Sequence, residues 1–392
     1  MAFGLSPAAN PRVQWLRLVL LGAMLSGMLC CIPLWLGTRE YPTIPLFPHW
    51  LILPSSCGPL LLGAVLASLV LAAWFFRPAI IFFLAATLYL FGCDQNREQP
   101  WFYIYWVMLL LNLLPEATAL AACRLAFSLV YFWAGIQKLN GTFFDEVPAW
   151  FVQPAADWGW PNAIVSMMRA GVYLTPFLEV FIAAGVWFRK TRWFAITIAA
   201  ILHLAALLFL GPIGRDVNRV IWPWNIAMIA LLIVLFATKE PSPLAQTWRD
   251  LRRSSCALLI VGLYGFLPLL SFFGLWDSYL SFALYSYNLA NAEIYVSHSG
   301  FACLPPKLQA YVYPVKNYNP ALQLPYMFEF PMWAQADMGV PPLPEPRGYL
   351  ILFQHITTYV TNDDDCLMLL KTRRGKVLLY HPGATNPVVL KP

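Results

Sequence analysis

The sequence predicts an all-α polytopic membrane protein of about nine transmembrane helices, with a small exported α/β or β cap at its C-terminus. Of the 392 residues, 60% are hydrophobic and 11% are charged, and the mean hydropathy is +0.62. A soluble protein carries about 25% charged residues. The apolar residues gather in stretches close to the ~20 residues that cross a bilayer core. Only the region after residue 276 is too polar to span.

Nine spans are expected, which makes residues 1–276 the transmembrane domain and residues 277–392 the extracytoplasmic domain. The spans are 13–36, 58–76, 78–93, 101–114, 119–138, 171–188, 193–212, 220–237 and 256–276. The third and fourth are short, so they form either one tilted hairpin or a partly re-entrant pair. The first is too long for a signal peptide, and no small-x-small cleavage pattern follows it.

Lysine and arginine counts predict the orientation, because cytoplasmic loops are enriched in both residues. One side holds the richer set: Arg12, Arg17, Arg77, Arg124, Arg189, Lys190, Arg192, Lys239, Arg249, Arg252 and Arg253. The other side holds Arg39, Arg97, Arg169, Arg215 and Arg219. We therefore expect a cytoplasmic N-terminus and an extracytoplasmic C-terminus. The net charge of +6 reflects these loops, and no basic stripe predicts nucleic-acid binding.

The exported region is expected to be a small cap. Residues 300–346 are rich in proline and predict extended chain laid over another part of the protein. Residues 348–360 fit either a helix or a strand. Residues 366–371 and 376–381 predict two strands of a hairpin. Cys303 and Cys366 both lie in this exported region, where a disulfide is allowed, and the sequence leaves their pairing open.

Lys138 is the first candidate site residue, because it ends the apolar stretch 119–138. A lysine at the end of such a helix is often only a snorkelling anchor. Helical spacing places Tyr131 and Ala134 on the same face, with Gly135 beside them, and small residues let a neighbouring helix come close. The aromatic residues of 143–160 follow directly, so we expect them to line a cavity at the lysine amine.

Each of the two following spans contains one ionisable group. Glu179 lies eight residues, and His203 nine residues, from the extracytoplasmic end of its span, which is ~12–14 Å deep at ~1.5 Å per residue. Asn225 lies at a shallower depth. Two interpretations stay open: a structural Glu–His hydrogen bond between helices, and a base or proton relay in a cavity open to the outside or to lipid.

Residues 119–237 resemble the core of the vitamin K-dependent gamma-carboxylases and the related HTTM (horizontally transferred transmembrane) family. The resemblance rests on VYFWAGIQKLNGTFF, a later helix with the acidic residue, ILHLAALLF and RVIWPWNIAMI. It implies that Lys138 is a base toward a quinol cofactor and that His203 is the family's helix histidine. It also implies a bacterial inner-membrane protein of the HTTM type. Contacts to that cofactor are expected from Tyr131, Ala134, Gly135, Trp150 and Asn225.

Two departures from the family pattern concern the chemistry. The segment GCDQNREQPWFYIYW contains no histidine, although the family has one before its fourth span. The exported region is also far shorter than in the carboxylases, which hold a protein substrate. We expect Asp94, Arg97 and Glu98 to form a solvated loop, with Trp101 and Tyr103 in the aromatic belt at the membrane interface.

Two function classes remain. In the first, the protein is a quinol-dependent enzyme in which neutral Lys138 takes a proton from the quinol, while His203 and Glu179 shuttle protons or orient the ring. In the second, it is a non-catalytic membrane protein or maturation factor that binds an exported protein through its cap. The expected partners are the lipid bilayer and either a quinone or an exported protein. A transporter is disfavoured because no inverted repeat is visible.

Overall fold

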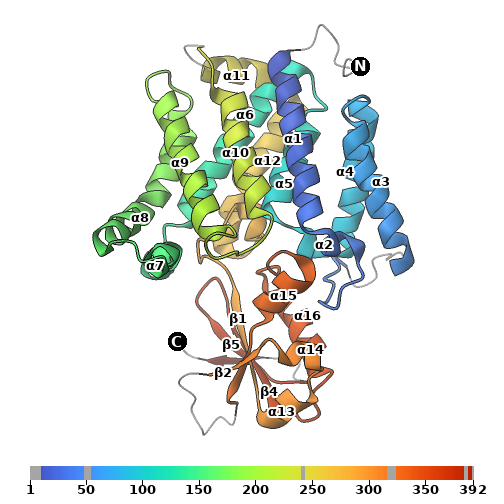
Figure 1. Ribbon diagram of the computed structural model, residues 1–392. Coiled ribbons are helices and arrows are strands. Elements are labelled where there is room, and N and C mark those ends of the chain that lie inside the picture. The colour runs from blue at the N-terminus through green and yellow to red at the C-terminus, as the bar shows by residue number, and fades with distance from the viewer. Residues whose placement is uncertain (1–9, 48–53, 240–242, 316–323, 384–386, 391–392) are drawn as a thin grey trace.

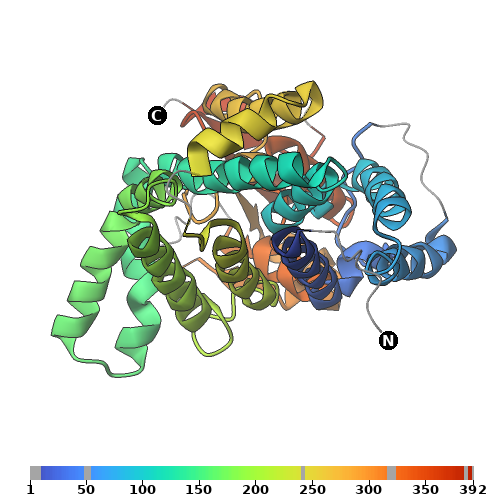
Figure 2. The ribbon, with the colours of Figure 1, turned by 90° about the horizontal axis from the view of Figure 1, so that it is seen from above.

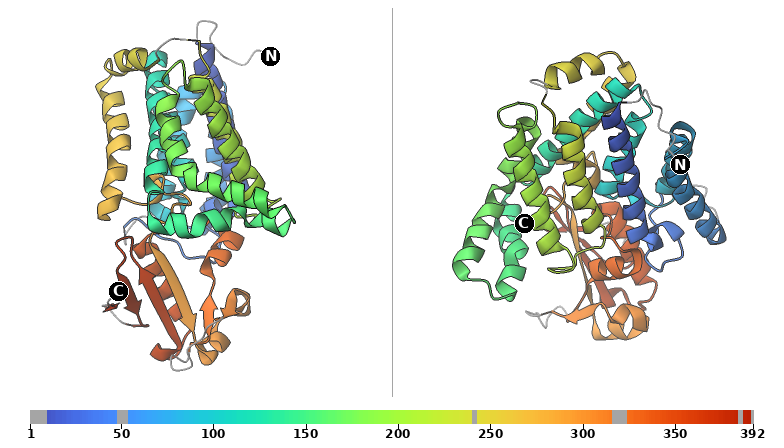
Figure 3. Two further views of the ribbon diagram at one scale, coloured as in Figure 1. Left: turned by 90° about the vertical axis from the view of Figure 1, so that its left-hand side faces the viewer. Right: turned by 45° about the horizontal axis from the view of Figure 1, so that its top comes forward.

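The structure is a computed structural model that describes residues 10–47, 54–239, 243–315, 324–383 and 387–390. Figure 1 shows a helical bundle with a smaller sheet-containing unit stacked against one of its ends. The N-terminal end of the bundle and helix α11 (Pro243–Leu251) lie at the end away from that unit. The side view in Figure 3 shows the same two-part arrangement.

Within the described ranges, six helices are long and apolar enough to cross a membrane. They are α1 (Pro11–Cys30), α4 (Phe76–Cys93), α6 (Glu116–Gln137), α8 (Asn162–Gly185), α9 (Arg192–Leu210) and α12 (Ser255–Leu270), the last continuing as a 3-10 turn to Phe273. Three shorter apolar helices occupy the other expected positions: α3 (Gly58–Leu71), α5 (Pro100–Leu111) and α10 (Ile221–Phe236). Apolar composition therefore located the helices, and six of these nine are long and apolar enough to be candidate membrane spans.

Helix α6 is the central element of the bundle. It packs against α5, α8, α10, α11 and α12, and the end-on view in Figure 2 shows it running through the middle of the molecule. It lies tightly against α8 at Gly135, where an added Cβ would lie 2.6 Å from the carbonyl oxygen of Pro176 and 2.9 Å from a methyl of Val180. A small residue is therefore needed at this crossing.

The first expected span is not one continuous helix. Helix α1 ends at Cys30, Cys31 leaves the helical conformation with φ −132° and ψ 45°, and the short helix α2 (Ile32–Leu36) follows. Pro33 explains the break, because its ring has no N–H and clashes with the carbonyl four residues earlier in a continuous helix. Helix α8, in turn, begins at Asn162, nine residues before the expected start of the sixth span.

The expectation of a solvated loop at residues 94–99 is wrong. All six side chains are buried, none more than 4% exposed. Asp94 pairs with Arg39 and accepts hydrogen bonds from the backbone of Ile44 and Asn96 at 3.1 and 3.2 Å. Trp101 packs at Gly27 in the core rather than in an interfacial belt. The polar residues are compatible with burial because the backbone groups around them accept or donate most of their hydrogen bonds.

The C-terminal unit contains an antiparallel six-stranded sheet in the order β2-β3-β1-β4-β5-β6. The strands are β1 (Asn291–Val296), β2 (Val312–Pro314), β3 (Tyr326–Phe328), β4 (Cys366–Lys371), β5 (Val377–Tyr380) and β6 (Val388–Leu390). Strands β4 and β5 form the predicted hairpin, with Leu369 opposite Leu379. Both Cys303 and Cys366 are free thiols, and Cys366 is buried in β4.

Helices complete this unit. They are α13 (His298–Cys303), α14 (Pro306–Gln309), α15 (Phe330–Met338) and α16 (Pro346–Thr357), and α16 packs on β1 and β4. The expectation of extended chain over 300–346 is therefore only partly right, because α15 and two strands lie within it. The stretch around Pro341 and Leu343 does cover residues 94–99: the Leu343 amide donates to Asn96, and Gln99 donates to the Pro341 carbonyl at 3.3 Å.

Candidate functional site

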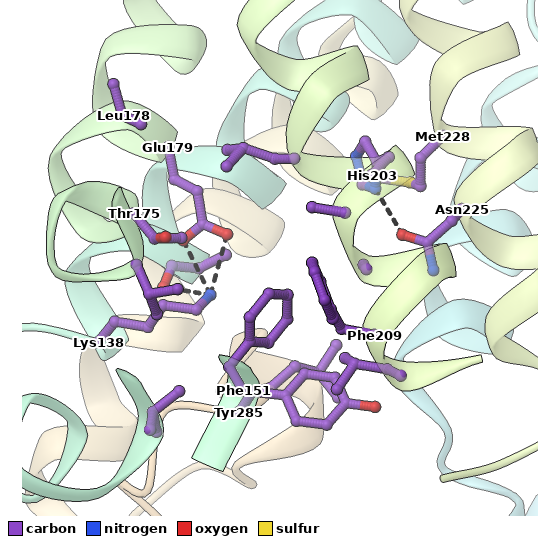
Figure 4. A pocket seen from close by; sticks show the side chains of 18 of the residues that line it. Lys138, Phe151, Thr175, Leu178, Glu179, His203, Phe209, Asn225, Met228 and Tyr285 are labelled. Atoms are coloured by element: carbon purple, nitrogen blue, oxygen red, sulfur yellow. Dashed lines mark hydrogen bonds and ion pairs between the residues drawn. The ribbon is translucent and has the colours of Figure 1, made fainter. Parts of the chain in front are cut away.

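Lys138 forms an ion pair with Glu179. It stands at the C-cap of α6, and its Nζ lies 2.8 Å and 3.0 Å from the two carboxylate oxygens of Glu179 on α8. It also donates to the carbonyl of Ala134 at 3.3 Å. The two side chains are only 9% and 15% exposed. The close packing of α6 and α8 brings them together, and Figure 4 shows the pair on one wall of a cavity.

Pro176 shapes the same wall. It lies inside α8, one turn before Glu179. Because Pro176 has no N–H, it cannot donate the usual helical hydrogen bond to the carbonyl of Val172. Val172 is itself part of the cavity wall.

His203 is held between two side chains from other helices. Tyr131 Oη lies 2.6 Å from His203 Nε2, and Asn225 Oδ1 lies 2.7 Å from His203 Nδ1. The amide nitrogen of Asn225 donates to the carbonyl of Ile221 at 2.8 Å, so the Asn225 oxygen is left to accept. The imidazole therefore carries its proton on Nδ1 in the neutral form, and its Nε2 accepts from Tyr131.

These groups line one cavity of about 400 Å³ between α6, α7 (Gly141–Asp157), α8, α9 and α10. Its remaining wall is apolar and aromatic, with Phe143 and Phe151 from α7 and Phe209 from α9. Tyr285 closes it from the segment after α12 and holds a left-handed backbone, with φ of 48°. Such a backbone is uncommon outside glycine. Figure 4 shows the aromatic rings beside the Lys138–Glu179 pair.

Six of the eight residues selected from the sequence line this cavity: Tyr131, Ala134, Lys138, Glu179, His203 and Asn225. Gly135 does not, because it faces the α8 contact. Trp150 does not either. Its carbonyl accepts a hydrogen bond from Arg215 at 2.9 Å, and its ring stacks on Tyr285. Among the described contacts Glu179 and His203 are not hydrogen-bonded to one another; each has its own partner in the same cavity.

The aromatic lining was found only in part from the sequence. The segment after Lys138 supplies Phe143 and Phe151, as expected, through helix α7. Phe209 and Tyr285 were missed. Phe209 looks like any other apolar residue of a span, and Tyr285 lies 147 positions after Lys138 with no local pattern that connects the two. The cluster of tyrosines at 285 and 287 was the one available signal.

Comparisons with protein-family models, with curated proteins and with solved structures find no match to this chain.

Proposed function

We propose that the cavity beside Lys138 binds a quinol from the bilayer and that Lys138 takes a proton from one of its hydroxyl groups. The observation that carries the proposal is a buried lysine–carboxylate pair in the wall of an otherwise apolar cavity. A cavity of about 400 Å³ falls within the range of small-molecule sites, which combine apolar walls with a few placed polar groups. Aromatic rings on one side suit a flat ligand.

Access from the lipid supports a membrane-soluble ligand. Ile201 on α9 lines the cavity and is 58% exposed, so the cavity reaches the outer surface of the bundle. Gly171 on α8 also lines the cavity and is exposed. In a bilayer this surface contacts acyl chains, and a quinol dissolved there can enter between α8 and α9.

The ion pair can generate the neutral base. In the resting pair the proton resides on Lys138, and moving it to Glu179 gives a neutral amine and a neutral acid without changing the net charge. Apolar surroundings disfavour charged groups. They therefore reduce the free-energy difference between the charged Lys138–Glu179 pair and the neutral pair. The neutral amine then accepts the quinol proton and becomes an ammonium beside the quinolate oxygen. In sum, the proton passes from quinol to Glu179 through Lys138.

Tyr131 and His203 offer a second polar contact. Tyr131 donates to His203, so its oxygen remains free to accept a hydrogen bond from a ligand hydroxyl. Tyr131 lies two turns before Lys138 on the same face of α6, about 10 Å along the helix. We propose that these groups orient the ring and receive a second proton. No redox step is needed for this proton transfer.

The test is the oxidation of a short-chain ubiquinol by oxygen, with the protein in lipid nanodiscs. Because the quinolate anion gives up electrons most readily, a bound base accelerates the reaction. Lys138→Ala should lose the acceleration by about 10²–10⁴-fold, the usual contribution of a positioned base. Lys138→Arg should lose it too, since arginine keeps its proton, yet should still bind the quinol. Lys190→Ala, an exposed lysine in the turn between α8 and α9, is the matched control.

Full activity in the arginine variant would show that Lys138 is only a charged anchor. If ubiquinol neither binds nor copurifies, the enzyme proposal fails as a whole, and a partner-binding role for the cap becomes the better explanation. The wider resemblance to the gamma-carboxylases remains a proposal as well, and it would then lose its chemical basis.

We also propose that the cap is exported from a bacterial cell. The turn between α8 and α9, which contains Arg189, Lys190 and Arg192, lies at the end of the bundle away from the cap, as does α11 (Figure 1). Lysine and arginine mark the cytoplasmic side. Reporter fusions after Arg192 and after Arg253 should therefore be cytoplasmic, and one after Pro392 should be exported.

A further inference from the structure

A second cavity, of about 310 Å³, lies between α4, α5 and α12. It shares no lining residue with the cavity at Lys138. Its walls are almost entirely apolar, and along α5 they run from Tyr103 to Leu110, which is about 10 Å of helix. Leu88 on α4 and Leu263 on α12 line it while remaining 56% and 46% exposed. The cavity therefore reaches the surface that lipid would cover.

One end of this cavity is polar, and its main group is Glu98. The residue is 2% exposed, and neither carboxyl oxygen has a hydrogen-bond partner in the described structure. Arg347 forms a long ion pair with Glu98, with 3.7 Å between Nη2 and Glu98 Oε2, which is beyond hydrogen-bond distance. Arg347 also forms a two-pronged pair with Asp277. Glu98 therefore has charged neighbours in Arg347 and Asp277, but its two oxygens make no hydrogen bond within the described structure. A buried polar group without a hydrogen bond is costly, so Glu98 can still bond to a ligand in the cavity.

The local charges favour a neutral Glu98. Burial raises the pKa of this carboxyl well above its ordinary value of 4.5, and the negative charge of Asp277 raises it further, while Arg347 acts in the opposite direction. A protonated carboxyl both donates and accepts a hydrogen bond. Such a group matches a hydroxyl rather than an amine or a phosphate.

Two further polar atoms of the lining lack partners. They are the hydroxyl of Tyr264 on α12 and the indole N–H of Trp276. Trp276 directly precedes Asp277, which contacts the same Arg347 as Glu98, so the indole lies at the polar end. The ring of Tyr103, five positions after Glu98, packs against Tyr264 with centroids 5.3 Å apart. Three unsatisfied groups thus border one apolar cavity.

We infer that this cavity is a binding site for a lipid alcohol, a molecule with an apolar chain and a single hydroxyl head that exchanges hydrogen bonds with Glu98. The chain lies along α5 toward Leu110, and the exposed Leu88 and Leu263 flank the entry from the bilayer. The site is independent of the proposed quinol cavity, because no lining residue is common to both.

Binding of radiolabelled farnesol to the protein in nanodiscs tests the inference, with 1-dodecanol, dodecane and dodecylamine as competitors. Farnesol should bind and 1-dodecanol should compete, which would show that the hydroxyl and not the branched chain is recognised. Glu98→Leu should weaken binding roughly fivefold, the loss of about one hydrogen bond. Glu98→Gln should retain it, because an amide also donates and accepts.

Leu263→Trp fills the cavity and should abolish farnesol binding. Leu259→Trp is its matched control, because Leu259 lies one turn away on α12, is 62% exposed and does not line the cavity. Equal competition by dodecane would overturn the inference, since it would reduce the site to a lipid-filled groove. Stronger competition by dodecylamine would also overturn it, because Glu98 would then be an ionised cation site. So would full binding in Leu263→Trp.

Discussion

Two buried polar clusters lie in the part of the bundle nearer the cap, and they differ in what their side chains contact. At residues 94–99 the groups are largely occupied: Asp94 holds Arg39 and two backbone amides, and Arg97 donates to the carbonyl of Leu34 at 3.1 Å. At Lys138 and Glu179 the pair borders about 400 Å³ of free volume. Buried charge is common to both regions, whereas free volume beside it is what permits a ligand.

Glu98 shares features of both regions. It belongs to the 94–99 segment by sequence, but like Glu179 it borders a cavity. Its neighbours Asn96 and Gln99 contact the cap segment around Leu343. The same short stretch therefore holds the cap on one side and faces an apolar cavity on the other.

The largest expected effect is at Asp94. Replacing it with leucine leaves the buried Arg39 side chain without its carboxylate and removes the negative charge near Arg97, which should lower the free energy of unfolding by about 3–5 kcal/mol. Thermal unfolding of the detergent-purified protein measures this. Asp94→Asn keeps the hydrogen bonds from Ile44 and Asn96, so its unfolding temperature should lie between those of the unchanged protein and of Asp94→Leu. An unchanged unfolding temperature in Asp94→Leu would mean that this cluster is not structural.

A smaller effect is expected at Lys138. Lys138→Met leaves Glu179 without its cation, but the carboxyl can protonate or be hydrated in the adjoining cavity, so the cost should be about 1–3 kcal/mol. The double variant Lys138→Met with Glu179→Gln should recover most of it, because no lone charge remains. The same thermal assay compares the three proteins. If the cost of the double variant equals the sum of the costs of the two single variants, Lys138 and Glu179, which lie 2.8 Å apart, do not stabilise one another.

Raising the pH should destabilise the protein through Glu98. Its pKa is raised in the folded protein by burial and by Asp277. Stability from this group is therefore complete below the unfolded pKa of about 4.5 and is lost as the pH rises toward the folded pKa, by at most about 1.4 kcal/mol per pH unit. Unfolding temperatures from pH 5 to 9 should decline less steeply in Glu98→Gln. If the unfolding temperatures of the two proteins decline equally with pH, a group other than Glu98 is responsible for the pH dependence.

The smallest effect is expected at Asn225. Asn225→Leu removes the acceptor of the His203 Nδ1 proton, yet cavity water can replace it, so the cost should be about 1 kcal/mol. The more sensitive readout is quinol oxidation, because the imidazole loses its fixed tautomer and Tyr131 its orientation. Asn225→Asp, which still accepts, should preserve that orientation. Strong destabilisation without any change in activity would assign Asn225 to packing alone.

Much of the helical framework was predictable from local pattern. The apolar stretches become helices because a helix satisfies its own backbone hydrogen bonds, and in lipid this requirement is strict. The β4–β5 hairpin likewise follows from two short apolar runs that flank a turn at Arg373, Arg374 and Gly375. Helix lengths were less predictable: α1 stops at Cys30 and α8 starts at Asn162, where proline and neighbouring helices decide the ends.

The sequence alone selected Lys138, Glu179, His203 and Asn225, because an ionisable or amide group in an apolar stretch stands out. It also set their approximate depths. Their pairing was decided only by the tertiary structure, since depth along a helix does not say which neighbouring helix its side chain faces. Glu179 meets Lys138, and His203 meets Tyr131 and Asn225. Residues 94–99 were misjudged for a related reason: the cap residues that cover them come 242 to 252 positions later, and only folding brings so distant a partner to a polar loop.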